Sequence, residues 1–185
     1  MPGYQEHAQT VTIVESKTTT IDVSLEKYIV HHNIGELVTI NGVQGIVFQN
    51  SPVVKIVSVK ETTAKWSTDY ETTNARDKDN GKANMDKIKY ISGWQTKYPT
   101  FKWCADYGDG WYLPSLNELK AIYAHKYEIN KVLLANNLQI LGSNNCWLWC
   151  STETNTNHAY SINFSNGNSL NKNGNYIVRA VYVIE

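Results

Sequence analysis

The fold of this chain depends most on the stretch GWYLPSLNELKAIY at residues 110–123. Ser115 and Glu118 have the spacing of a capping box, in which each side chain accepts a hydrogen bond from a free backbone N–H at a helix start. The apolar residues that follow recur at helical intervals and form one stripe: Leu116, Leu119, Ile122 and Tyr123. We therefore predict a helix over residues 115–125, with that stripe packed against a core.

Weaker helical patterns lie on both sides of this stretch. Apolar residues interleaved with lysines predict a short helix over residues 81–90. A second helix is predicted over residues 98–107, because Pro99 suits a first helical position and Gly108 suits a helix end. Residues 130–138 are expected to add one or two helical turns.

Beyond residue 142 the pattern changes to that of strands. The run CWLWCST at residues 146–152 is typical of a buried strand, and apolar residues alternate over residues 158–164. The chain ends in YIVRAVYVIE, a β-branched run at residues 176–185 that predicts one further strand.

The N-terminal third is also predicted to be β-structure. Short β-branched runs occupy residues 1–32, and two apolar runs flank Asn41-Gly42, a strong signal for a hairpin. Residues 61–80 are polar and predict an irregular connection. The order of strands, helices and strands predicts an α+β fold. We expect an N-terminal β-strand segment over residues 1–35 and one domain over residues 36–185.

The charge balance and hydropathy exclude several classes of partner. The 185 residues carry 17 basic and 17 acidic side chains, so no electrostatic surface for nucleic acid is expected. No apolar run approaches the roughly 20 residues that a membrane helix needs, so no membrane insertion is expected. The N-terminus is polar and shows no signal peptide.

No cofactor or metal is expected. The sequence contains no phosphate-binding loop, dinucleotide-binding glycine motif or zinc-protease motif. The run from Asp77 to Asn80 resembles a calcium loop but lacks the closing Glu. The three cysteines are expected to be buried thiols, although a disulfide from Cys104 to Cys146 or Cys150 stays open.

Asparagine and aromatic residues indicate where a ligand would bind. Eight of the 21 residues at 155–175 are Asn, several of them within predicted strands, where Asn is disfavoured. A strand that tolerates Asn has a face that the core does not use, and that face is free to bind. The predicted binding residues are Trp147, Thr154, Asn155, Asn157, His158, Tyr160, Asn163, Asn168, Asn171, Asn173 and Tyr176. The predicted core residues are Trp111, Leu113, Leu119, Trp149, Phe164, Val178 and Val181, and Arg179 is expected to pair with a buried carboxylate or carbonyls.

Four separated motifs resemble a known family. They are Trp111-Tyr112-Leu113-Pro114-Ser115 with Glu118-Leu119; Trp149-Cys150-Ser151-Thr152; Tyr160, Phe164 and Gly167; and Val178-Arg179-Ala180-Val181. In this order they resemble the C-terminal domain of a bacterial collagen-like adhesin group, whose C-type-lectin-like fold is related to the formylglycine-generating-enzyme superfamily. The resemblance implies a small antiparallel sheet with two or three helices.

The resemblance also bears on activity. The Asn-dense stretch before Val178 is similar to the variable region of proteins diversified by retroelements, although an undiversified relative would share these motifs. The spacing of Cys146 and Cys150 does not fit the catalytic pair of formylglycine-generating enzymes. The calcium motifs of true lectins are absent, so calcium-mediated sugar binding is not expected.

We therefore expect a non-catalytic binding and display module that recognises a protein or a glycan on a cell surface. The alternatives are an oxidase related to formylglycine-generating enzymes and a structural surface or virion component. The expected location is extracellular or at the cell surface, with the export signal absent from this sequence, or in a phage virion. The sequence is also compatible with an oligomer.

Overall fold

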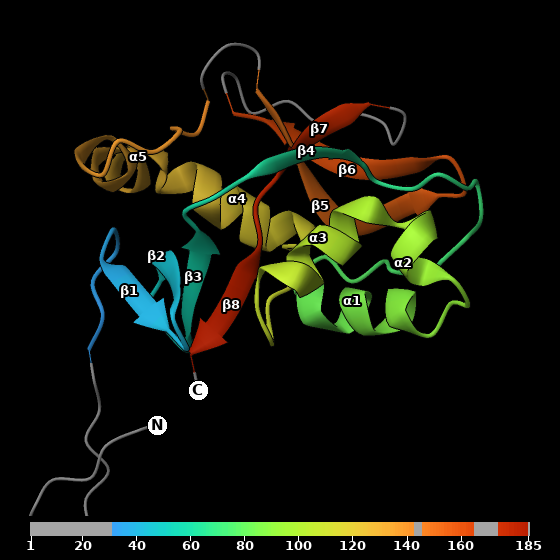
Figure 1. Ribbon diagram of the computed structural model, residues 1–185, viewed down its shortest axis with the longest axis horizontal. Coiled ribbons are helices and arrows are strands. Elements are labelled where there is room, and N and C mark those ends of the chain that lie inside the picture. The colour runs from blue at the N-terminus through green and yellow to red at the C-terminus, as the bar shows by residue number, and fades with distance from the viewer. Residues whose placement is uncertain (1–30, 143–145, 165–173, 185) are drawn as a thin grey trace, which may run out of the picture. The chain divides into compact units, whose positions relative to one another are not determined.

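Two four-stranded sheets are assembled from strands that lie far apart in the sequence (Figure 1). The computed structural model describes residues 31–142, 146–164 and 174–184, and residues His32–Ile184 form one compact unit. The first sheet has the order β1-β2-β3-β8, and its bounds are β1 Leu37–Ile40, β2 Val43–Gln49, β3 Val54–Ser58 and β8 Val181–Ile184. All of its pairs are antiparallel.

The second sheet has the order β4-β7-β5-β6. Its bounds are β4 Thr62–Lys65, β7 Asn175–Val178, β5 Trp147–Asn155 and β6 His158–Asn163. The pairs β4–β7 and β5–β6 are antiparallel, whereas β5 and β7 run parallel. The prediction of one small antiparallel sheet is corrected here, because the described residues form two sheets and one of them is mixed.

The helices follow the predicted pattern closely. Their bounds are α1 Gly81–Lys89, α2 Trp94–Lys97, α3 Pro99–Tyr107, α4 Leu116–Ala124 and α5 Lys126–Ala135. The three predicted helices correspond to α1, α3 and α4. The short helix α2 was not predicted, and α5 begins four residues before the predicted start. Strands and helices together confirm the α+β class.

Helix α4 contacts both sheets, through β2 of the first and through β5 and β6 of the second. The capping box at its start is complete: the Ser115 hydroxyl accepts from the Glu118 backbone N–H, and the Glu118 carboxylate accepts from the Ser115 N–H at 2.7 Å. The same carboxylate is buried and accepts from the Gly81 N–H, the Tyr112 hydroxyl and the Lys55 ammonium. A local helix cap thus also joins α4 to α1 and β3.

The first hairpin forms as its sequence predicts. Ile40 pairs with Val43, so Asn41 and Gly42 alone make the turn. Both residues have positive φ angles, 51° and 80°, which the twist of a two-residue hairpin requires and which Asn and Gly tolerate.

Two predictions for strands need correction. Residues 61–80 were expected to be irregular, yet Thr62–Lys65 form β4. The C-terminal run was expected to be one strand, yet it divides at Arg179 and Ala180 into β7 of one sheet and β8 of the other. The predicted N-terminal β segment lies outside the described residues, apart from residues 31–35, which form no strand.

Arg179 stabilises the point at which the C-terminal run divides between β7 and β8. Its guanidinium donates to Oε2 of Glu61 through Nε at 2.9 Å and through Nη2 at 2.6 Å. It also donates to the backbone carbonyls of Ser58, Val59 and Gln139. The prediction that Arg179 pairs with a carboxylate and carbonyls is confirmed.

The predicted core is confirmed as well. The core residues named from the sequence are all at most 3% exposed: Trp111, Leu113, Leu119, Trp149, Phe164, Val178 and Val181. All three cysteines are buried and free. No helix within the described ranges is both long enough and apolar enough to cross a membrane.

Candidate functional site

The predicted binding residues divide between the two ends of β5. Thr154, Asn155, Asn157 and His158 lie at the turn from β5 into β6, whereas Trp147 lies at the start of β5. A strand rises about 3.3 Å per residue, so the eight steps along the nine residues from Trp147 to Asn155 span roughly 25 Å. The structure therefore places two separate groups where the sequence predicted one continuous face.

The first group is the hairpin tip, residues 154–158. The Thr154 hydroxyl donates to the His158 carbonyl at 2.8 Å, and the Asn155 side-chain oxygen accepts from the Asn157 N–H at 2.9 Å. That oxygen also lies 2.9 Å from Nδ1 of His158. Asn155 and Asn157 are exposed, so much of the asparagine here serves turn geometry while the tip itself faces solvent.

The second group is an aromatic step formed by Trp147 and Tyr176. Their rings are stacked, with centroids 5.9 Å apart and an interplanar angle of 29°. Tyr176 also lies 4.6 Å from the ring of Trp149, which is fully buried and donates through its indole N–H to the Ala64 carbonyl at 2.9 Å. Trp147 and Tyr176 are each only partly buried. The aromatic step is therefore a partly exposed layer on a buried and hydrogen-bonded support.

The remaining predicted residues do not join these two groups. Asn163 is 1% exposed, so its side chain is buried and does not belong to a binding surface. Trp149 pairs with Ser161, so the adjacent Tyr160 points to the opposite face of the sheet from the aromatic step. Asn168, Asn171 and Asn173 lie outside the described residues.

The buried acidic residues serve the fold. The carboxylate of Glu153 accepts from the backbone N–H groups of Thr73 and Asn74, at 3.0 Å for the shortest bond to each, and fixes the loop before α1. In the predicted calcium-like run, Asp77 accepts from two backbone N–H groups and the Asn80 side chain caps α1. Among the described residues, no three His, Cys, Asp or Glu side chains are placed to hold a metal ion.

Burial also makes two thiols unreactive. Desolvation raises the pKa of Cys150 to about 12, and it raises the pKa of Cys104 well above its ordinary value. The Cys150 thiol donates to the Tyr160 carbonyl at 3.2 Å. At neutral pH these thiols are protonated, which is the state of a structural cysteine.

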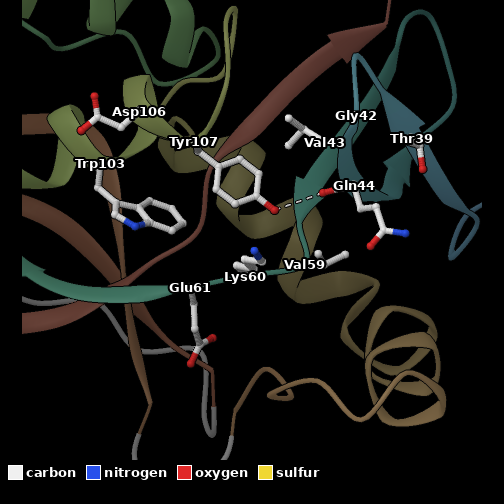
Figure 2. Close-up of a pocket in the computed structure, with 10 residues that line it drawn as sticks. All are labelled: Thr39, Gly42, Val43, Gln44, Val59, Lys60, Glu61, Trp103, Asp106 and Tyr107. Atoms are coloured by element: carbon white, nitrogen blue, oxygen red, sulfur yellow. Dashed lines mark hydrogen bonds between the residues drawn. The ribbon is translucent and has the colours of Figure 1, made fainter.

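An open hollow of about 570 Å³ was not predicted from the sequence (Figure 2). It lies between the β1–β2 hairpin, residues 59–61 after β3, and α3. Trp103 and Tyr107 reach it from α3, where they stand four residues apart and so share one helix face. The sequence signal for this hollow was the pattern W-x-x-x-Y, which lies on the side of the helix away from the buried Phe101. The predicted site does not include it, because that prediction was based on the C-terminal strands alone.

Comparisons with known proteins give the fold limited support. No protein-family model and no curated protein matches this chain. The structure is similar to the crystal structure of a fimbrial protein from Bacteroides ovatus, with a TM-score of 0.53 at 18% sequence identity. The match covers 69% of this chain and 35% of that protein, so the chain spans about a third of that protein's length. This likeness concerns the fold alone, and the C-type-lectin-like relationship stays a prediction.

Proposed function

We propose that this chain is a non-catalytic binding module displayed on a cell or virion surface, and that it binds a protein partner through the aromatic step. The observation that carries the proposal is the geometry of Trp147 and Tyr176, stacked at 5.9 Å and partly exposed above the buried Trp149. The fimbrial protein that shares part of this fold is consistent with a role at a surface.

The aromatic step has the physical properties of a binding hot spot. Trp and Tyr are enriched among the residues that contribute most to protein interfaces. Each has only two side-chain torsions, so little conformational entropy is lost when a partner immobilises it. The stack lies on β5 and β7, neighbouring strands of the sheet, so the rings are already ordered before a partner arrives.

The hairpin tip is the second element of the proposal. The exposed Asn157 side chain offers hydrogen-bonding groups on a turn that is fixed by the bonds of the Thr154 and Asn155 side chains. Such polar groups add specificity around or beside an aromatic anchor. The roughly 25 Å between the two groups suits an extended protein surface, whereas a small ligand would reach only one of them.

The proposal is tested with the fluorescently labelled full chain and a panel of bacterial and epithelial cells, measured by flow cytometry. Saturable binding is expected, and Trp147→Ala should weaken it about tenfold or more, as removal of a hot-spot aromatic does. Trp147→Phe should retain part of the binding. Tyr127→Ala is the matched control, because Tyr127 is a 79% exposed aromatic on α5, outside both groups.

Treatment of the cells identifies the chemical class of the partner. Protease treatment should abolish binding, whereas periodate oxidation of glycans should leave it intact. Loss of binding on periodate alone would mean that the partner is a glycan and would contradict the protein assignment. Equal binding by wild type and by folded Trp147→Ala, or no binding to any of these cells, would contradict the proposal itself.

A further inference from the structure

The open hollow beside α3 has the composition of a small-ligand site. Its volume of about 570 Å³ lies within the usual range for pockets that bind small molecules, roughly 300–1,000 Å³. Such pockets combine apolar or aromatic walls with a few polar groups that fix the ligand's orientation. Both components are present here, and neither belongs to the aromatic step or the hairpin tip.

The aromatic wall consists of Trp103 and Tyr107. Their ring centroids lie 5.2 Å apart at an interplanar angle of 39°, and both side chains are partly exposed. Figure 2 shows the two rings beside each other at the hollow, with Tyr107 between Trp103 and the β1–β2 hairpin. The Tyr107 hydroxyl donates to the Gln44 carbonyl at 3.2 Å, which fixes its ring against that hairpin.

The polar groups around this wall include both donors and acceptors. Within the described part of the chain, the Trp103 indole N–H and the Lys60 ammonium donate to no other residue. The exposed Gln44 amide supplies a donor and an acceptor. Burial raises the pKa of Tyr107, so its phenol stays protonated and remains the donor to the Gln44 carbonyl. A hydroxyl group both donates and accepts, so a ligand rich in hydroxyls matches this set.

The charges at the hollow favour a neutral ligand. Glu61 is neutralised by Arg179, and Asp106 is paired with Lys102 one helical turn before it. Lys60 is the cation that lines the hollow without such a pair among the described residues. One exposed ammonium beside two carboxylates gives no cluster of positive charge for a phosphate or sulfate group.

We propose that this hollow binds a neutral sugar residue, whose C–H face lies on the Trp103 and Tyr107 rings and whose hydroxyls bond to the Trp103 N–H, Gln44 and Lys60. The aromatic rings contact the apolar face of a pyranose, while its hydroxyl edge meets the mixed donors and acceptors. The proposal is independent of the protein partner proposed for the aromatic step, because it rests on α3 and the β1–β2 hairpin.

The test is an NMR titration of the full chain with methyl glycosides of glucose, galactose, mannose, fucose and N-acetylglucosamine. The readout is the indole N–H signal of each of the six tryptophans, assigned with Trp103→Phe and Trp147→Phe. At least one sugar should shift the Trp103 signal saturably with a millimolar or tighter Kd, and should leave the Trp147 signal in place. Trp103→Ala should weaken binding about tenfold, and Trp147→Ala should not change it.

Each other outcome overturns the proposal. One such outcome is that no sugar of the panel shifts the Trp103 signal saturably up to about 50 mM, which corresponds to negligible affinity. Another is that a sugar shifts the Trp147 signal and leaves the Trp103 signal in place. Tighter binding of adenosine monophosphate or glucose 6-phosphate than of every neutral sugar would overturn the assignment of a neutral ligand. The wild-type shifts keep the test decisive if Trp103→Ala fails to fold. If the sugar proposal fails, the proposed protein binding is not affected, because the cell-binding experiment depends on Trp147.

Discussion

Replacement of Arg179 by Met is expected to destabilise the fold more than any surface substitution. Its guanidinium makes five hydrogen bonds, two to Glu61 and three to backbone carbonyls, and its side chain is fully buried. These partners come from the end of β3, the connection to β4 and the segment after α5. Methionine fills similar space but supplies no donor, so the carboxylate and the carbonyls lose their partner.

The magnitude follows from burial. Removing one member of a buried ion pair costs about 3–5 kcal/mol, because the other charge is left uncompensated. The Glu61 side chain is 19% exposed, so water relieves part of this cost and the lower half of the range is expected. In a domain of this size each kcal/mol lowers Tm by about 2–4 °C, which gives a loss of about 6–16 °C.

Urea unfolding followed by tryptophan fluorescence, together with calorimetry, measures this loss directly. Arg179→Lys keeps the charge but loses the fork geometry, so an intermediate loss is expected. Lys102→Ala is the control, because its pair with Asp106 is exposed on both sides and contributes at most about 1 kcal/mol. Stability of Arg179→Met within about 1 kcal/mol of wild type would refute the reasoning, since a loss that small is typical of a surface pair.

Three further predictions concern a close contact, an ionisable group and the thiols. Gly81→Ala should lower stability by about 1–3 kcal/mol in a thermal melt, because its Cβ would lie 2.5 Å from the Leu113 carbonyl oxygen; an unchanged Tm would show that α1 shifts without cost. The hydrogen bond from Tyr98 lowers the pKa of Glu71 below 4.5, so its stabilisation is present above that pH and is lost as the pH falls through the folded-state pKa. Glu71→Gln should therefore flatten the acid side of the stability curve, and an identical slope would contradict this assignment. With the pKa of Cys150 raised to about 12 and all three thiols buried, Ellman's reagent should find almost no reactive thiol in the native protein and all three in urea; a single reactive thiol in urea would mean that a disulfide forms.

Much of the fold was predictable because its signals are local. The capping box of α4 needs only Ser115 and Glu118, three residues apart, and the structure shows both of its hydrogen bonds. The Asn41-Gly42 turn likewise depends on the φ angles of two adjacent residues. The hydrogen bond that Lys55 donates to Glu118 could not be predicted, because those residues are 63 positions apart and meet only when the segments that carry them pack together.

The candidate binding residues were less predictable for a geometric reason. Their sequence pattern indicated strands with polar positions. Such a pattern does not show how strands pair, so it does not show which residues of different strands lie close together. The structure separates Trp147 from the hairpin tip and buries Asn163. It also brings Trp147 against Tyr176, because β5 and β7 pair in parallel across a long separation in the chain.

The sequence by itself determined where the main helices form, where the first hairpin turns and which apolar residues are buried, because caps, turn angles and periodicity act between residues a few positions apart. The tertiary structure alone decided that the C-terminal run divides at Arg179, that β4 forms in a polar stretch, and that Trp103 and Tyr107 line a hollow. These features depend on hydrogen bonds and contacts between distant segments, such as the bond from Arg179 to the Ser58 carbonyl across 121 positions. Their free energy is gained only when both partners are already in place.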